Sequence, residues 1–160
     1  MTPAITIAEK SGIAYHIHDY QHDPASSSYG LEAAEKLALP AAQVFKTLVA
    51  ALDTGELVVA ILPVAARLNM KRLARALGAK KAVMAEAVKV ERSSGYVLGG
   101  VSPLGQKKSL LTVLDDSASG WPTIFVSAGR RGLEIELAPA DLEKLTRATL
   151  APITDTPGDL

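Results

Sequence analysis

Residues 44–63, VFKTLVAALDTGELVVAILP, contain two apolar runs on either side of a short polar segment. Apolar runs of this length are typical of buried strands, and the polar residues 53–56 between them suit a tight turn. The stretch therefore predicts an antiparallel hairpin with strands over 44–52 and 57–63. Strands joined this closely do not fit a regular β-α-β repeat, because parallel strands need a long crossover.

The rest of the chain predicts helices and strands without a regular alternation. Apolar spacing and capping residues predict helices over 3–10, 31–39, 70–77 and 139–148, and a helical turn over 87–92. Strands are expected over 14–18, 83–85, 110–114, 123–127 and 133–137. The prediction is a single α+β domain over residues 1–150, with a mixed, largely antiparallel β-sheet and flanking helices. A flexible C-terminal tail is expected over 151–160.

The composition excludes several classes of protein. The 160 residues include no cysteine, which excludes disulfides, a cysteine nucleophile and thiolate metal sites. Lys plus Arg and Asp plus Glu number 17 each, so a polyanionic partner would have to meet a local basic patch. No apolar run approaches the ~20 residues of a membrane span, and the N-terminus lacks the pattern of a signal peptide. A cytoplasmic protein without a membrane partner is expected.

A second stretch, residues 95–108 (GYVLGGVSPLGQKK), interrupts apolar residues with four glycines and a proline and ends in two lysines. A plain turn needs fewer such residues, and an open backbone can offer N–H and C=O groups to a ligand. An ordinary loop is the alternative interpretation. Tyr20, Tyr29 and Tyr96 flank the predicted loops, where they either line a cleft or pack at its rim.

Lys46 is the only charged residue of the first hairpin strand. With a period of two it shares a face with Val44, Leu48, Ala50 and Leu52. Burial of an unpaired ammonium is costly, so the side chain must reach water, pair with a carboxylate or meet a bound anion. A ligand-facing lysine and a lysine that snorkels to water are both compatible with the pattern.

Other polar residues give weaker signals. His16 and His18 share a strand face and His22 follows, but no third metal ligand is evident, so structural histidines are the better interpretation. Asp115 and Asp116 suit a solvated turn. Ser102 and Ser127 could bind a ligand through their hydroxyls, yet neither lies in a G-x-S-x-G elbow, so a serine-hydrolase triad is unsupported.

Basic residues cluster in three places: Lys71, Arg72 and Arg75 with Lys80 and Lys81; Lys107 with Lys108; and Arg130 with Arg131. Such runs are usually solvated faces, but three of them on a neutral protein are compatible with a modest phosphate-binding surface.

Several of these segments resemble, in one order over nearly the whole chain, the YbaK family of aminoacyl-tRNA deacylases. The resembling segments are residues 1–4, 18–24, 44–48, 62–65, 71–81, 92–108 and 129–137. The family is related to the editing domain inserted in bacterial-type prolyl-tRNA synthetases. The resemblance implies a compact α+β domain that hydrolyses the ester between a wrong amino acid and the terminal ribose of tRNA.

The resemblance also implies a set of site residues. The family's invariant lysine falls on Lys46, its tyrosine on Tyr20 and its G-x-x-P-x-G loop on residues 100–105. The expected catalytic residues are Lys46 and Gly100, without a cofactor or a metal. The expected substrate-binding residues are Tyr20, Tyr29, Thr47, Tyr96, Gly99, Val101, Ser102, Pro103, Gly105 and Ser127. Contacts to tRNA are expected from Lys71, Lys80, Lys81, Lys107 and Arg130.

Two positions depart from the family pattern: Tyr29 stands where phenylalanine is frequent, and Glu134 where aspartate is common. These differences concern the size of the pocket and not the class of reaction.

The substrate that the resemblance implies is Cys-tRNA(Pro). For cysteine-charged tRNA the family is thought to let the substrate's own thiol attack its carbonyl and expel the tRNA. The implied partners are aminoacylated tRNA(Pro) and, as a further candidate, prolyl-tRNA synthetase, with no DNA. The alternatives are deacylation of another mischarged tRNA, such as Ala-tRNA(Pro), and a non-catalytic module that binds tRNA or a synthetase.

Overall fold

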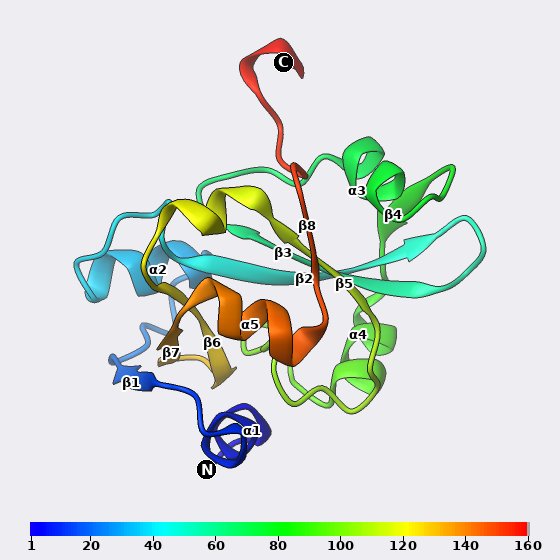
Figure 1. Ribbon diagram of the computed structural model, residues 1–160. Coiled ribbons are helices and arrows are strands. Elements are labelled where there is room, and N and C mark those ends of the chain that lie inside the picture. Colours follow the sequence, from blue (N-terminus) through cyan, green and yellow to red (C-terminus); the bar gives the residue numbers. More distant parts are fainter. Residues whose placement is uncertain (160) are drawn as a thin grey trace.

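The computed structural model describes residues 1–159, and the 44–63 hairpin lies at the centre of its larger sheet (Figure 1). β2 (Phe45–Leu52) pairs antiparallel with β3 (Leu57–Pro63), as predicted. β5 (Leu111–Asp115) runs parallel to β3, and β8 (Thr149–Ala151) runs parallel to β5. On the other side of the hairpin β4 (Ala82–Met84) pairs antiparallel with the end of β2. The order β4-β2-β3-β5-β8 makes this sheet mixed.

A second, three-stranded sheet has the order β1-β7-β6 and is wholly antiparallel. Its strands are β1 (Tyr15–Asp19), β6 (Ile124–Arg130) and β7 (Leu133–Leu137). A parallel bridge between Val44 and Phe125 joins it to the larger sheet at the start of β2. The sequence predicts one sheet, and the division into two follows from this single point of contact.

Helices cover both faces of the larger sheet (Figure 1). α3 (Met70–Ala76) begins at Asn69, whose side chain accepts a hydrogen bond from the Arg72 N–H at 2.9 Å, as its N-cap role predicts. α3 packs on Ala50, Ala60 and Leu62. The other face carries the larger core, which includes residues of α1 (Pro3–Ser11), α4 (Ala87–Ser94) and α5 (Pro139–Thr146).

α2 (Tyr29–Lys36) begins two residues earlier than predicted and packs against Val44 and Val64, beside the start of β2. Short 3-10 helices, η1 (Asp116–Gly120) and η2 (Pro157–Asp159), complete the elements. Within residues 1–159 no helix is both long and apolar enough to cross a membrane.

Residues 151–159, within the segment predicted to be a tail, form defined contacts with the domain. β8 includes Ala151, and Ile153 is fully buried in the core beneath α3. Its N–H donates to a carboxylate oxygen of Asp115 at 3.0 Å, and the Arg72 guanidinium lies 3.1 Å from Asp159. A single apolar residue between prolines gives no periodic signal, so only the tertiary packing reveals this segment. Leu160 lies outside the described residues.

Asp115 is correspondingly not a solvated turn residue. Its side chain is buried and caps η1, because it accepts hydrogen bonds from the Ser117 N–H and hydroxyl and from the Ile153 N–H. Asp116, next in the chain, is exposed as expected.

Candidate active site

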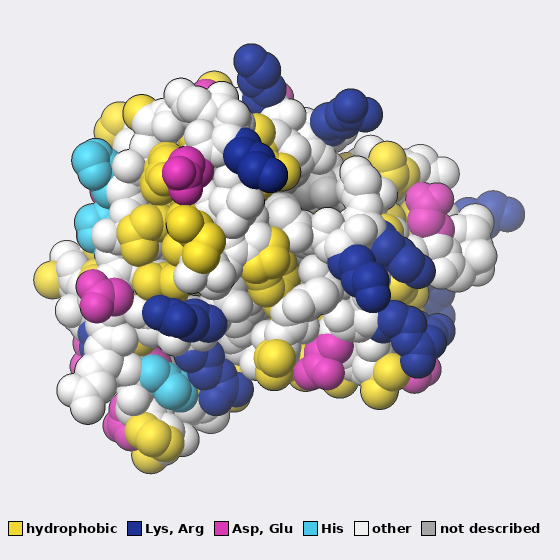
Figure 2. Space-filling view, turned by 90° about the horizontal axis from the view of Figure 1, so that it is seen from below, with side chains coloured by type: hydrophobic (Ala, Val, Ile, Leu, Met, Phe, Trp, Pro, Cys, Tyr) yellow, Lys and Arg dark blue, Asp and Glu magenta, His cyan; other side chains and the backbone are white. Residues whose placement is uncertain are grey.

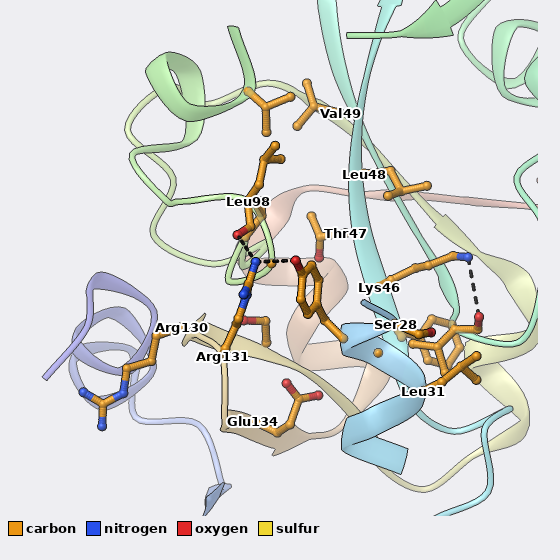
Figure 3. Close-up of a pocket in the computed structure, with 18 of the residues that line it drawn as sticks. Ser28, Leu31, Lys46, Thr47, Leu48, Val49, Leu98, Arg130, Arg131 and Glu134 are labelled. Atoms are coloured by element: carbon orange, nitrogen blue, oxygen red, sulfur yellow. Dashed lines mark hydrogen bonds between the residues drawn. The ribbon is translucent and has the colours of Figure 1, made fainter. Parts of the chain in front are cut away.

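A cavity of about 520 Å³ opens beside the first half of β2, where β4 no longer pairs with that strand. Its walls come from α2, β2, the start of α4, the β6–β7 turn and the glycine-rich loop, which comprises residues 95–108 (Figure 3). The predicted site residues that line it are Tyr20, Tyr29, Lys46, Thr47, Gly99, Val101, Ser127 and Arg130. The cavity thus unites residues from segments that lie far apart in the sequence.

Lys46 extends along the cavity wall away from Arg131 and Glu134 (Figure 3). Its ammonium donates to the backbone carbonyl of Ala66 at 2.8 Å and lies 3.5 Å from that of Val64. Burial lowers the pKa of Lys46 below its ordinary value, and no carboxylate among residues 1–159 forms an ion pair with it. The positive charge is therefore held by neutral carbonyl groups and remains available to an anionic ligand.

Glu134 supplies a buried carboxyl group on another wall of the cavity. It lies on β7 directly opposite Ser127 of β6, and its residue is only 7% exposed. Burial raises the pKa of Glu134 to about 8. The sequence marked this position only as a departure from a family pattern, because nothing in the chain shows that a glutamate on a β-hairpin is buried. A cation entering the cavity would favour the charged form of this group.

Five residues that carry hydroxyl groups line the same cavity: Tyr20, Ser28, Tyr29, Thr47 and Ser127. Burial, followed by the nearby charge of Glu134, raises the pKa of Tyr20 above its ordinary value. The Thr47 hydroxyl is buried without a hydrogen-bond partner among the described residues, and the Ser127 hydroxyl accepts from the Gly129 N–H at 3.1 Å. None of these hydroxyls is hydrogen-bonded to a histidine or to a carboxylate in the described structure, so none is paired with a general base there.

Only part of the glycine-rich loop faces the cavity. Leu98, Gly99 and Val101 line it, whereas the other predicted residues of this loop lie outside the cavity lining. The Tyr96 hydroxyl donates to the Leu104 carbonyl at 2.5 Å, and the fully buried Ser102 hydroxyl accepts from the Leu104 N–H. The other members of this group are Gly100, Pro103 and Gly105.

Two of these glycines are required by close approach of other backbone segments. A Cβ on Gly100 would lie 2.7 Å from the Arg130 Cα, and one on Gly105 would lie 2.7 Å from the Pro3 backbone. The glycines therefore hold the loop against the β6–β7 turn and the start of α1. The close approach of the Arg130 backbone explains why position 100 is a glycine, and the predicted contact of Gly100 with substrate stays a prediction.

Gly100→Ala is expected to lower the free energy of unfolding by about 1–3 kcal/mol, because the methyl group overpacks against the Arg130 backbone. For a domain of this size the melting temperature should fall by about 2–4 °C per kcal/mol. Thermal unfolding followed by circular dichroism measures it. Gly120→Ala is the matched control, since a Cβ there meets nothing within 4 Å. Equal melting temperatures for the two variants would contradict the packing argument.

The basic residues predicted to contact tRNA do not converge at the cavity. Lys71 lies on α3, Lys80 and Lys81 precede β4, and Lys107 lies at the end of the glycine-rich loop, all of them exposed. Figure 2 shows Lys and Arg side chains in separate groups on one face, with hydrophobic and acidic side chains between them. Arg130 belongs to the cavity lining, but its guanidinium turns away from the interior (Figure 3).

Two of the three histidines have contacts within the protein. His18 Nε2 lies 2.8 Å from a Glu136 carboxylate oxygen, and His22 Nδ1 lies 2.6 Å from Glu32. Glu32 is buried and also accepts from the Asp23 N–H at 2.8 Å, so it fixes the loop that leads into α2. The structure thus explains these residues without a ligand.

The cavity is largely apolar and combines an ammonium, a buried carboxyl group and arginines at its edge, which are features of a site for a small polar ligand. A family model for the aminoacyl-tRNA editing domain matches residues 23–145. The chain belongs to this family, which confirms the resemblance seen in the sequence and makes the protein an aminoacyl-tRNA deacylase.

Two curated proteins show the extent of the similarity. EbsC of Enterococcus faecalis, whose name proposes a Cys-tRNA(Pro)/Cys-tRNA(Cys) deacylase, is 37% identical over 155 residues, which cover 96% of this chain and 93% of EbsC. YwhH of Bacillus subtilis is 26% identical over 129 residues, which cover 81% of this chain and 82% of YwhH.

Solved structures confirm the fold. The crystal structure of the hypothetical protein APE2540 superposes with a TM-score of 0.86 at 23% identity, covering 96% of this chain and all of that one. A crystal structure described as that of a proposed trans-editing enzyme for prolyl-tRNA synthetase gives a TM-score of 0.82 at 24% identity, covering 98% of this chain and 99% of the other.

Proposed function

We propose that this protein removes cysteine from mischarged Cys-tRNA(Pro), acting in trans on tRNA that a synthetase has released. The similarity to EbsC over almost the full length of both chains supports the substrate class. The observation that carries the proposal is the cavity itself, where the Lys46 ammonium and the buried Glu134 carboxyl group lie on different walls of a largely apolar lining. Aminoacylated tRNA(Pro) is the proposed partner, in the cytoplasm, with prolyl-tRNA synthetase as a second.

The charges of the site match the charges of an aminoacyl ester. The α-amino group is free in such an ester, and its ammonium form would pair with the Glu134 carboxylate. The carboxyl group is esterified and therefore neutral, so negative charge appears at its carbonyl oxygen only as the reaction proceeds. Lys46 would stabilise that developing charge or bind the terminal phosphate, and the loop at Gly99 would hold the carbonyl and ribose through its backbone.

The proposed nucleophile is the thiol of the substrate. This protein has no cysteine, and the hydroxyls of the cavity lack a hydrogen-bonded histidine among the described residues. The substrate sulfur would form a bond to its own carbonyl carbon as the ester bond to the ribose breaks. The thiol proton ends on the released ribose oxygen, and water then opens the cyclic thioester to free cysteine. The protein contributes orientation and charge stabilisation.

A panel of charged tRNAs tests this function. Cys-tRNA(Pro) is expected to be deacylated at least ~100-fold faster than Ser-tRNA(Pro) and Ala-tRNA(Pro), since only cysteine carries an internal thiol nucleophile held near its carbonyl. Serine is the matched control because it differs from cysteine in one atom. Release of radiolabelled amino acid measures each rate, with and without prolyl-tRNA synthetase.

Equal rates for cysteine and alanine would contradict the thiol mechanism and favour Ala-tRNA(Pro) deacylation by water. Binding without turnover of any ester would favour a non-catalytic tRNA-binding module.

A further inference from the structure

Arg131 spans the mouth of the cavity from the β6–β7 turn to α2. Its Nη2 donates to the Tyr29 hydroxyl and lies 3.5 Å from the Leu98 carbonyl oxygen. Its Cζ also lies 3.7 Å from the centroid of the Tyr29 ring. Figure 3 shows the guanidinium between Leu98 and the α2 side of the cavity. The side chain is thus fixed in place although it is exposed.

Gly99 makes room for this arrangement. A Cβ at that position would lie 2.3 Å from the Arg131 Nε, and the Gly99 φ of +91° would strain any other residue. The loop therefore receives the guanidinium directly on its backbone.

The charge of Arg131 is not neutralised within the described protein. None of the ion pairs among residues 1–159 includes Arg131, and its recorded acceptors are one hydroxyl and one carbonyl. A guanidinium has five N–H donors in a planar fork that matches phosphate oxygens. Most of that donor capacity remains open toward solvent at the entrance to the site.

We propose that Arg131 binds a backbone phosphate next to the 3′-terminal nucleotide of tRNA. The aminoacyl carboxyl group is an ester, so the first anions outside a cavity that holds the aminoacyl group and its ribose are the phosphodiesters. Tyr29 and Leu98 position the guanidinium for this contact before the RNA arrives. The choice of RNA as the polyanion rests on the proposed function, but the inference is independent of which amino acid is removed.

Arg130 provides a matched control, because it is adjacent, equally charged and turned away from the cavity (Figure 3). The experiment uses a fluorescently labelled RNA minihelix that carries no amino acid and has a single-stranded ACCA end. Its binding is measured by fluorescence anisotropy across a salt series. Arg131→Gln is expected to weaken binding about fivefold to tenfold, as for one exposed charge-assisted contact. The slope of log K against log[salt] should become shallower by about 0.7, the value for one single-strand phosphate contact.

Arg130→Gln is expected to weaken binding less than Arg131→Gln does and to change the salt slope less, because its guanidinium turns away from the cavity. Arg131→Lys should keep the slope but bind more weakly, because lysine retains the charge and loses the planar fork. Thermal unfolding confirms that each variant is folded.

The inference is overturned if Arg131→Gln keeps the natural slope, if Arg130→Gln shows the larger loss, or if the natural protein shows no salt-dependent binding. The RNA in this experiment carries no amino acid. Failure to release cysteine in the tRNA panel would therefore contradict only the proposed substrate and would leave this result standing.

Discussion

Replacing Lys46 with alanine is expected to lower kcat/KM for deacylation by about 10²–10³-fold, the usual loss for a group that stabilises charge in the transition state. The Lys46 ammonium is a half-buried cation without a carboxylate partner in the described structure, so no negative group of the described residues neutralises its charge. Initial rates on Cys-tRNA(Pro) measure the effect.

The same substitution should change stability little. It removes the hydrogen bond to the Ala66 carbonyl, worth about 0.5–1.5 kcal/mol, and also removes a partly desolvated charge. Lys89→Ala is the control, because Lys89 is an exposed lysine of α4 beside the cavity-lining Ala87 and Val90. Full activity of Lys46→Ala would show that this lysine supports only the loop at residues 64–66.

Glu134→Gln is expected to stabilise the protein at high pH and to impair its activity. Because the pKa of Glu134 is raised to about 8 in the folded state, the folded protein holds this proton more tightly than the unfolded chain does. The contribution of Glu134 to the free energy of unfolding is therefore largest below the ordinary pKa of glutamate and is lost as the pH rises through about 8. Glutamine is neutral at every pH, so the variant does not lose this contribution. Its free energy of unfolding should therefore rise relative to that of the natural protein as the pH increases.

The gain has an upper limit of about 5 kcal/mol at pH 9 and should vanish near pH 4, where the natural side chain is also neutral. Chemical denaturation at several pH values measures it. Glu136→Gln is a control of opposite sign, since burial raises the pKa of Glu136 but hydrogen bonds from Thr123 and His18 more than reverse this and lower it. That variant should lose stability at neutral pH.

The activity of Glu134→Gln should fall about tenfold or more, mainly through KM, because a buried carboxylate no longer meets the substrate ammonium. Gain of stability with loss of activity is the behaviour of a functional group kept at a cost to the fold. A variant that is more stable at pH 9 and fully active would contradict the proposed role of Glu134. A variant without any pH-dependent gain would contradict its burial.

The sequence predicts most elements of this fold because their signals are local. The 44–63 hairpin, the Asn69 cap and the turn between β6 and β7 depend on neighbouring residues. The division into two sheets and the packing of Ile153 depend on contacts between distant segments, which no local pattern encodes.

Some residues of the candidate site could likewise be predicted from local sequence, and others depend on contacts between distant segments. Lys46 could be singled out as a lone charge on an apolar strand, whereas the close backbone neighbours that require glycine at positions 100 and 105 could not be predicted from the sequence. Arg130 and Arg131 cannot be distinguished by composition, because only the β6–β7 turn decides which guanidinium faces the cavity.

The pairing of β1 with β7 has a consequence for synthesis of the protein. Tyr15 lies opposite Leu137, so the first strand has no partner in its sheet until that residue has left the ribosome. Tyr20, which follows β1, and Glu134, which lies on β7, both line the cavity although they are far apart in the sequence. A nascent chain can form the central hairpin early, but it acquires its binding cavity only after β7 has been made.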